Sequence, residues 1–510
     1  MEISLIESFE RTVEENKGKT ALSFEGESLT FYELRKASHL FAQFIAISFN
    51  LAANKPIAVF LPKSIDVVVS DISCMYNACP FMNLDVKTPL KRIMNILDLV
   101  KPQLIVTDAT HIGTFTNIGL RIPIIDVSAS CDDSIAGGNT VLEKCLSAQV
   151  DTDPVCIINT SGSTGTPKSV VLSHRGFFDF LEWSIQAFSF NGSEVLGSLS
   201  PVVFDIFDFE MFLMMYKGSS VVLLDNAKAA FPVLLLKELK ERDVNFLFWV
   251  PSIMVTIANM DLLSSVDLTQ LRLVWFAGEV FPTKQFNYWR KSLPSTLFAN
   301  LYGPIEITLD CTFYIVDREI PDDEPIPIGY PCRNTDILIL DDQDRPCATG
   351  EKGELCVRGT SLALGYYNNP EKTAAAFTQN PLNSSYPELI YRTGDIVSRD
   401  DEGIIHFNGR KDSLIKHMGY RIELGEIEHI VTNTLEIAKY CCVVYNSESK
   451  DIILFYEGSN DFDLVDVRRR ISEVLPKYMM PTRYERMVEL PRNTNGKIDR
   501  AYLSSLAVTK

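Results

Sequence analysis

The segment from Asn159 to Val170 reads NTSGSTGTPKSV and joins several hydroxyl side chains and two glycines to one lysine. Hydroxyl groups, approachable backbone N–H groups and an ammonium group are what a loop needs to hold phosphate oxygens. The strict phosphate-loop motif has a glycine directly before its lysine, and here Pro167 precedes Lys168. A solvated Ser/Thr/Gly linker is the second interpretation of this composition. The apolar runs VCIIN and SVVLSH on either side are typical of two strands, but the segment alone leaves both interpretations open.

Two further segments carry charged side chains that could do chemistry. VVFDIFDFEM places Asp205 and Asp208 three residues apart, and either carboxylate could pair with a buried ammonium group. The plain alternative is an aspartate on a turn or at the surface. NTNGKIDR contains Lys497, which taken by itself is typical of a solvated lysine on a turn.

Protein-built metal centres are not indicated by the sequence. The six histidines form no HxxxH or HExxH pattern, and the eleven cysteines show no CxxC spacing. We therefore expect reduced, mostly buried thiols rather than a zinc site or a disulfide framework.

The overall charge and the amino-terminal segment exclude several classes of protein. The 510 residues carry a formal net charge of -18, which argues against a nucleic-acid partner. The acid-containing start MEISLIESFERTVEENKGK lacks the features of a secretory signal, so we expect a cytoplasmic protein. The most apolar stretch, residues 246–258, is shorter than a membrane span and contains Pro251, so we expect no membrane insertion.

The elements that must position these side chains follow an α/β pattern. Strand-like runs at 55–61, 103–108, 219–225 and 271–278 alternate with segments of helical period, such as the one that begins at Pro232. From about residue 326 shorter strands with turns predict a hairpin or a small barrel. The last hundred residues mix helix and strand again. We predict a large domain over residues 1–411 and a small α+β domain over residues 412–510.

Taken together, eight ordered segments resemble the adenylate-forming superfamily, specifically the amino-acid adenylation enzymes of nonribosomal peptide synthesis and the D-alanine:carrier-protein ligases. The resemblance covers nearly the whole chain. Its segments are TSGSTGTPK from Thr160, FD at 204–205, NLYGPIE from Asn300, GELCVRG from Gly353, GYYNNPEKT from Gly365, YRTGD from Tyr391, GRKDSLIKHMGYRIELGEIE from Gly409 and NGKIDR from Asn495.

The resemblance implies a fold, cofactors and a nucleotide site. The fold is a large N-terminal domain of α/β subdomains plus a small β-barrel, followed by a small mobile α+β domain that carries the catalytic lysine. The cofactors are ATP and Mg²⁺, with Lys497, Lys168 and Glu306 as catalytic residues and Glu306 also as the metal ligand. The implied ATP-binding residues are Thr160, Ser161, Gly162, Ser163, Thr164, Gly165, Asn300, Leu301, Tyr302, Gly303, Asp395 and Arg410.

The same resemblance implies an amino acid as substrate. Asp205 directly follows the motif phenylalanine and would pair with the substrate ammonium, so we choose it over Asp208. Four bulky side chains in the pocket predict a small, alanine-sized amino acid, and Asp310 could recognise a hydroxyl group or a second nitrogen. The implied pocket residues are Asp205, Ile206, Phe209, Phe248, Trp275, Ala277, Leu301, Leu309 and Asp310.

The resemblance also implies a moving small domain and a separate partner. The domain would rotate at Asp412 so that the phosphopantetheine thiol of a carrier protein can attack the acyl adenylate. We reject Asp412–Leu414 as a carrier attachment site, although it spells DSL, because it lacks the glycines that directly precede such a site and lies inside the hinge motif. We expect a monomer that acts on a separate phosphopantetheinylated carrier protein.

Departures from the family pattern keep two alternatives open. Ile305 stands where the family usually has a threonine that donates toward the adenylate phosphate, and Leu414 replaces the usual glutamine beside the hinge. A lost hydrogen bond to a charged group costs about 1.5 to 3 kcal/mol. The alternatives are an acyl- or aryl-CoA ligase and a catalytically impaired nucleotide-binding homologue.

Overall fold

The computed structural model describes residues 3–116, 119–129, 138–161, 167–411, 414–457, 463–492 and 498–508, apart from the side chains of residues 501 and 508. These residues divide into two compact units. The first contains residues 1–86, 101–158 and 170–409, and the second contains residues 87–100, 159–169 and 410–510.

Two sheets built largely from parallel strands form the framework that carries the site. The nine-stranded sheet has the order β15 (Tyr330–Pro331), β14 (Thr312–Ile315), β13 (Leu297–Tyr302), β12 (Leu273–Phe276), β11 (Phe246–Trp249), β9 (Val195–Ser198), β10 (Ser220–Leu223), β1 (Thr20–Phe24), β2 (Glu27–Thr30). The seven-stranded sheet has the order β18 (Gly365–Tyr366), β8 (Lys168–Ser173), β7 (Pro154–Thr160), β4 (Phe81–Asn83), β3 (Ile57–Val59), β5 (Leu104–Thr107), β6 (Ile124–Asp126).

Helices connect these strands, as parallel pairing requires. The apolar run predicted at 271–278 forms β12, and the helical segment predicted from Pro232 forms α9. The α/β class is therefore confirmed. The helices of the first unit are α1 (Leu5–Asn16), α2 (Phe31–Ser48), α3 (Ile65–Tyr76), α5 (Gly113–Thr116), α6 (Gly138–Ser147), α7 (His174–Phe188), α8 (Asp205–Lys217), α9 (Pro232–Glu241), α10 (Pro251–Asn259), α11 (Thr283–Ser292) and α12 (Pro370–Ala376).

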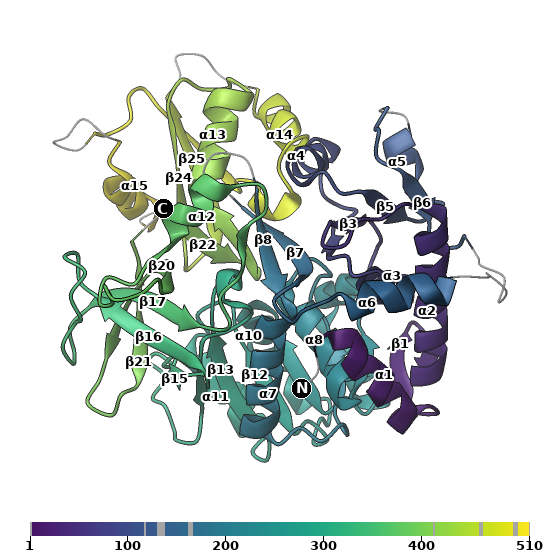
Figure 1. The fold of residues 1–510 in the computed structure, drawn as a ribbon. Helices are drawn as coiled ribbons and strands as arrows, with labels where there is room; N and C mark the ends of the chain where they lie inside the picture. The colour runs from purple at the N-terminus through teal and green to yellow at the C-terminus, as the bar shows by residue number, and fades with distance from the viewer. Residues whose placement is uncertain are drawn as a thin grey trace. The chain divides into compact units, whose positions relative to one another are not determined.

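The segments predicted as a hairpin or small barrel form a separate five-stranded sheet. It has the order β16 (Thr335–Leu340), β17 (Gly353–Gly359), β20 (Leu389–Arg399), β19 (Phe377–Gln379), with β21 (Ile405–Arg410) also paired to β20. These strands lie side by side in Figure 1. The eleven-residue β20 carries Asp395 at its middle.

The second unit has its own small core. Its elements are α4 (Leu90–Val100), β22 (Leu414–His417), β23 (Tyr420–Glu423), α13 (Leu424–His429), a π-helix (Ile430–Thr434), β24 (Cys441–Asn446), β25 (Asp451–Glu457), α14 (Leu464–Ser472), β26 (Arg483–Met487) and α15 (Arg500–Val508). Helices α13 and α15 both contact β24 (Figure 1). This mixture of helix and strand is the α+β texture predicted for the C-terminal residues.

Ten of the eleven cysteines fall within the described ranges, and all ten are free thiols. Eight of them are buried. Burial raises the pKa of the Cys74, Cys156 and Cys332 thiols well above the usual range, so these groups stay protonated.

Bilayer-spanning helices are not found: none of the helices in the described ranges is both long enough and apolar enough to cross a membrane.

Candidate functional site

The carboxyl ends of four neighbouring parallel strands gather most of the predicted residues of the first unit. β9, β11, β12 and β13 are adjacent and parallel, so the segments that follow them emerge at one edge of the sheet. That edge is where open α/β sheets bind ligands. The segment after β9 leads to Asp205, the one after β12 to Ala277, and the one after β13 to Gly303.

The predicted adenine and ribose residues are linked to each other. The hydroxyl group of Tyr302, at the end of β13, donates a hydrogen bond to the carboxylate of Asp395 on β20. Both side chains are buried, and the backbone N–H of Asp395 donates to the Thr393 hydroxyl at 2.9 Å. Asn300 is fixed through its side-chain amide, which donates to the Pro327 carbonyl at 2.7 Å. These bonds hold the side chains in place before any ligand arrives, which is what precise binding requires.

Gly303 lets two chain segments meet closely. A Cβ atom at this position would lie 2.3 Å from the carbonyl oxygen of Leu309 and 2.4 Å from the Cα atom of Asp310. A side chain at this position would collide with the backbone of residues 309–310, so only glycine fits there. Residues 309–310, predicted to line the amino-acid pocket, are thereby brought against the end of β13.

Glu306, the predicted metal ligand, is fully buried in a short 3₁₀ helix over Ile305–Ile307. The Tyr366 hydroxyl donates to its carboxylate at 2.8 Å. Tyr366 was missed in the sequence, although it is the first tyrosine of the GYYNNPEKT segment. Ile305 packs against the apolar core and offers no donor in place of the family's threonine.

The phosphate segment belongs to the second unit, where two of its polar side chains have partners. The Ser161 hydroxyl donates to the Arg421 carbonyl at 2.7 Å and accepts from the Glu423 backbone N–H at 3.1 Å. Lys168 pairs with the Glu423 carboxylate at 2.7 Å. By contrast, the buried hydroxyl of Thr160 has no hydrogen-bond partner among the described residues. A buried hydroxyl without a partner is costly, and a ligand oxygen would satisfy it.

Several predicted residues cannot be placed. Gly162, Ser163, Thr164, Gly165, Asp412 and Lys497 lie outside the described residues. Arg410 is described as the last residue of β21 and is partly buried.

The two candidate aspartates for the ammonium have different environments. Asp205 is the first residue of α8 and only partly buried, and a helix N-terminus favours a negative charge there. Asp208 is buried, and burial together with the neighbouring Asp71 carboxyl raises its pKa well above the usual range. Asp205 is therefore the more accessible of the two carboxyl groups.

The apolar residues of the predicted pocket belong to one buried cluster whose centre is aromatic. Phe209 stacks on Trp275 with ring centroids 5.4 Å apart, and Phe248 meets Trp275 edge-on at 5.3 Å. The Trp275 indole N–H has no hydrogen-bond partner among the described residues. The remaining pocket residues, Ile206, Ala277, Leu301, Leu309 and Asp310, are also buried. Aromatic rings that already contact one another leave little volume for a substrate side chain.

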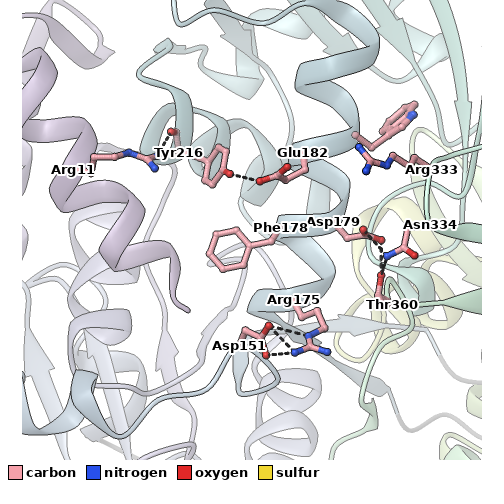
Figure 2. A pocket seen from close by; sticks show the side chains of 11 residues that line it. Arg11, Asp151, Arg175, Phe178, Asp179, Glu182, Tyr216, Arg333, Asn334 and Thr360 are labelled. Atoms are coloured by element: carbon pink, nitrogen blue, oxygen red, sulfur yellow. Dashed lines mark hydrogen bonds and ion pairs between the residues drawn. The ribbon is translucent and has the colours of Figure 1, made fainter. Parts of the chain in front are cut away.

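A cavity of about 910 Å³ lies elsewhere in the first unit, along α7. Figure 2 shows that its charged side chains are largely paired with one another, as in the ion pair of Arg175 with Asp151 and the hydrogen bond from Tyr216 to Glu182. None of the predicted site residues that the structure describes lines this cavity. It is therefore separate from the candidate site.

Parallel sheets, a buried tyrosine–aspartate pair at a strand terminus and a glycine-rich hydroxyl segment between two strands define the adenylate-forming class of α/β enzymes. The chain belongs to the AMP-binding enzyme family, whose model matches residues 9–367.

Curated relatives agree with this assignment. The chain is 30% identical over 510 residues to zwittermicin A synthase ZmaJ of Bacillus cereus, covering 98% of this chain and 95% of that protein. It is 29% identical over 477 residues to an L-proline--[L-prolyl-carrier protein] ligase of Streptomyces coelicolor, covering 89% of this chain and 87% of the relative. Against tyrocidine synthase 3 of Brevibacillus parabrevis, 29% identity covers 98% of this chain but only 8% of that protein.

Solved structures share the fold. The Vibrio cholerae adenylation domain AlmE, in complex with glycyl-adenosine-5'-phosphate, matches with a TM-score of 0.84 at 20% identity over 100% of this chain and 98% of that one. The amide bond synthetase McbA of Marinactinospora thermotolerans matches with a TM-score of 0.85 at 18% identity over 98% of this chain and 99% of that one.

Proposed function

We propose that this protein uses ATP to activate a small amino acid as its aminoacyl adenylate and then transfers the aminoacyl group to the phosphopantetheine thiol of a separate carrier protein. In the first step a substrate carboxylate oxygen attacks the α-phosphorus of ATP, and pyrophosphate leaves. In the second step the thiol sulfur attacks the acyl carbon, its proton is released, and AMP leaves. Family membership supports the first step, and the carrier-protein ligase among the relatives supports the second.

The position of Asp205 is the observation that favours an amino acid, rather than an acid without an amine, as the substrate. An ammonium group taken from water into a protein needs a carboxylate partner. Asp205 supplies one at the start of α8, and the same helix supplies Phe209 to the aromatic cluster. A substrate paired with Asp205 would thus direct its side chain toward rings that leave little room, which favours glycine, alanine or another amino acid of that size.

The residues present fit ATP and Mg²⁺. The unpartnered Thr160 hydroxyl would donate to a phosphate oxygen, and the Asp395 carboxylate can accept from ribose hydroxyl groups. Glu306 would bind Mg²⁺ as a single carboxylate. The described residues contain no group of three acidic, histidine or cysteine side chains arranged for a metal, which suits an ion that phosphate oxygens and water hold for the most part. Bound Mg²⁺ supplies positive charge next to the phosphates.

We also propose that Lys497 neutralises charge at the α-phosphorus and that Asp412 is the hinge. We propose further a domain boundary near residue 411, a cytoplasmic location and a monomeric state.

An ATP–pyrophosphate exchange assay tests the proposal. The panel holds the proteinogenic amino acids, their D-forms and β-alanine, with acetate, propionate and benzoate as acids that lack an amine. We expect exchange with one or a few small amino acids and little with the amine-free acids. Exchange driven by amine-free acids would indicate an acyl- or aryl-CoA ligase. ATP binding without any exchange would indicate an impaired homologue.

A further inference from the structure

Lys63 follows β3 and holds the backbone that leads into the candidate amine site. Its ammonium group donates to the carbonyl oxygen of Ser198 at 2.6 Å and to that of Ser200 at 2.8 Å. A third contact reaches the Asn226 side-chain oxygen at 3.4 Å. Part of the Lys63 side chain is exposed, but its ammonium group is thus enclosed by three protein oxygens. An ammonium group has three donors, so this set of acceptors uses all of them.

The two carbonyl groups belong to the segment that delivers Asp205. Ser198 is the last residue of β9, and α8 begins at Asp205. Between them the Phe204 backbone N–H donates to the Pro201 carbonyl at 3.1 Å, which closes a turn. A fixed end at Ser200 and a closed turn after it leave the position of Asp205 little freedom.

Among the described residues, no carboxylate forms an ion pair with the ammonium group of Lys63. Glu210, on α8, is fully buried, and neither of its carboxyl oxygens has a hydrogen-bond partner among the described residues. Glu210 and Asp225 act on Lys63 only electrostatically, and Asp225 also accepts from the Ala227 backbone N–H at 2.9 Å. The two shorter bonds of Lys63 therefore go to the segment before α8, where they act on backbone position.

We propose that Lys63 is a positioning residue for substrate selection, which fixes the segment 198–204 so that the Asp205 carboxylate meets the substrate ammonium. This inference rests on the proposed function. It goes beyond that function by assigning the preference for an amine partly to Lys63, a residue in the loop between β3 and α3 that is not among the proposed substrate contacts.

Lys19 offers a matched control. Its ammonium group also donates to two backbone carbonyls, those of Gly192 and Gly218. Gly218 is the C-cap of α8, so the two lysines hold the chain near opposite ends of the same helix. Loss of Lys19 removes the same kind of contact far from Asp205.

The experiment compares Lys63→Met, Lys63→Arg and Lys19→Met with the wild type in pyrophosphate exchange. The probe pair is alanine, in whichever enantiomer exchanges faster, and propionate, which lacks the amine. The quantity measured is the ratio of kcat/KM for alanine to kcat/KM for propionate. We expect Lys63→Met to lower this ratio at least tenfold with the KM for ATP changed less than twofold. We expect Lys63→Arg to recover part of the ratio, and Lys19→Met to lower the melting temperature with the ratio changed less than twofold.

Two outcomes are separable. If Lys63→Met lowers the rates with alanine and propionate in equal proportion, Lys63 is only structural and the inference is wrong. If the wild type itself shows no preference for alanine, or for any other amine in the panel, the proposed function fails instead. Should Lys63→Met be insoluble, Lys63→Gln, which keeps one donor group, replaces it with the same expectation.

Discussion

The nucleotide side and the amine side of the candidate site are organised in different ways. On the nucleotide side the functional side chains bond directly to other side chains, as Tyr302 does to Asp395 and Tyr366 to Glu306. On the amine side Asp205 begins α8, and Lys63, in the loop after β3, bonds to the Ser198 and Ser200 carbonyls in the segment before that helix. The nucleotide side is therefore fixed by bonds between its own side chains, whereas the amine side depends on contacts several residues away from Asp205.

The largest expected effect is on the amine side, where Asp205→Ala should lower activation of the amino acid and leave ATP binding nearly unchanged. Asp205→Ala leaves the substrate ammonium without its partner, a loss of about 3 to 5 kcal/mol, which lowers kcat/KM for the amino acid by about two to four orders of magnitude. Equilibrium binding of ATP should change little, and calorimetry checks this. Asp208→Asn is the control, because Asp208 is buried and burial raises its pKa, and its exchange rate should stay within about threefold of the wild type. Equal losses in the two variants would contradict the choice of Asp205.

A smaller effect is expected on the nucleotide side, where Tyr302→Phe should raise the KM for ATP and leave the preference for an amine unchanged. Tyr302→Phe removes the hydroxyl donor from the buried Asp395 carboxylate. Hydrogen bonds to charged groups contribute about 1.5 to 3 kcal/mol, so we expect the KM for ATP to rise at least tenfold. The alanine-to-propionate ratio should not move. A changed ratio with an unchanged KM for ATP would show that the two sides are not separate.

Tyr366→Phe sharpens the comparison within the nucleotide side. It removes the hydroxyl that orients Glu306, at a cost of about 1 kcal/mol, or about fivefold in kcat. Because Glu306 is the proposed Mg²⁺ ligand, we also expect the Mg²⁺ concentration for half-maximal rate to rise. A lower kcat with the same Mg²⁺ dependence would mean that Tyr366 supports the fold rather than the ion.

Glu210→Gln should have the smallest effect on activity. Its main effect should be on the pH dependence of the free energy of unfolding. Burial raises the pKa of Glu210 to about 8, against the opposing effect of Lys63. A raised pKa in the folded state stabilises the protein below the unfolded pKa, and this contribution is lost as pH rises toward 8. Glutamine does not ionise, so the variant escapes that loss. Burial also lowers the pKa of Lys63 to about 7, but Lys63 is present in both proteins.

Urea unfolding at pH 5.5 and pH 8.5 checks this sign. The free energy of unfolding of Glu210→Gln, relative to the wild type, should increase by about 1 to 3 kcal/mol between the two pH values. No relative change between the two pH values would mean that Glu210 is already charged in the folded protein at pH 5.5.

The sequence was a good guide to local structure. Apolar runs predicted β3, β5, β10 and β12, and the strands on either side of the phosphate segment are present as β7 and β8. The family resemblance selected Asn300, Tyr302 and Asp395, of which the last two prove to be bonded to each other. Local propensity and motif order suffice for such features, because neighbouring residues determine them.

Partners distant in the chain could not be predicted. Lys63 and Ser198 are 135 residues apart, and Glu306 and Tyr366 are 60 apart. Periodicity reports which face of an element is buried but not which element lies opposite it. For the same reason, the sequence left Asp205 and Asp208 chemically equivalent, although only one of them is buried.

The buried, protonated cysteine thiols matter for the proposed product, the acyl adenylate. An acyl adenylate is a strong electrophile, and thiolates rather than thiols are the nucleophiles that would intercept it. Cys156 lies on β7, the strand that leads into the phosphate segment, yet its sulfur is buried and holds its proton. Burial thus protects the Cys156 sulfur from acylation by the proposed acyl adenylate, and alkylating reagents at neutral pH should spare this cysteine.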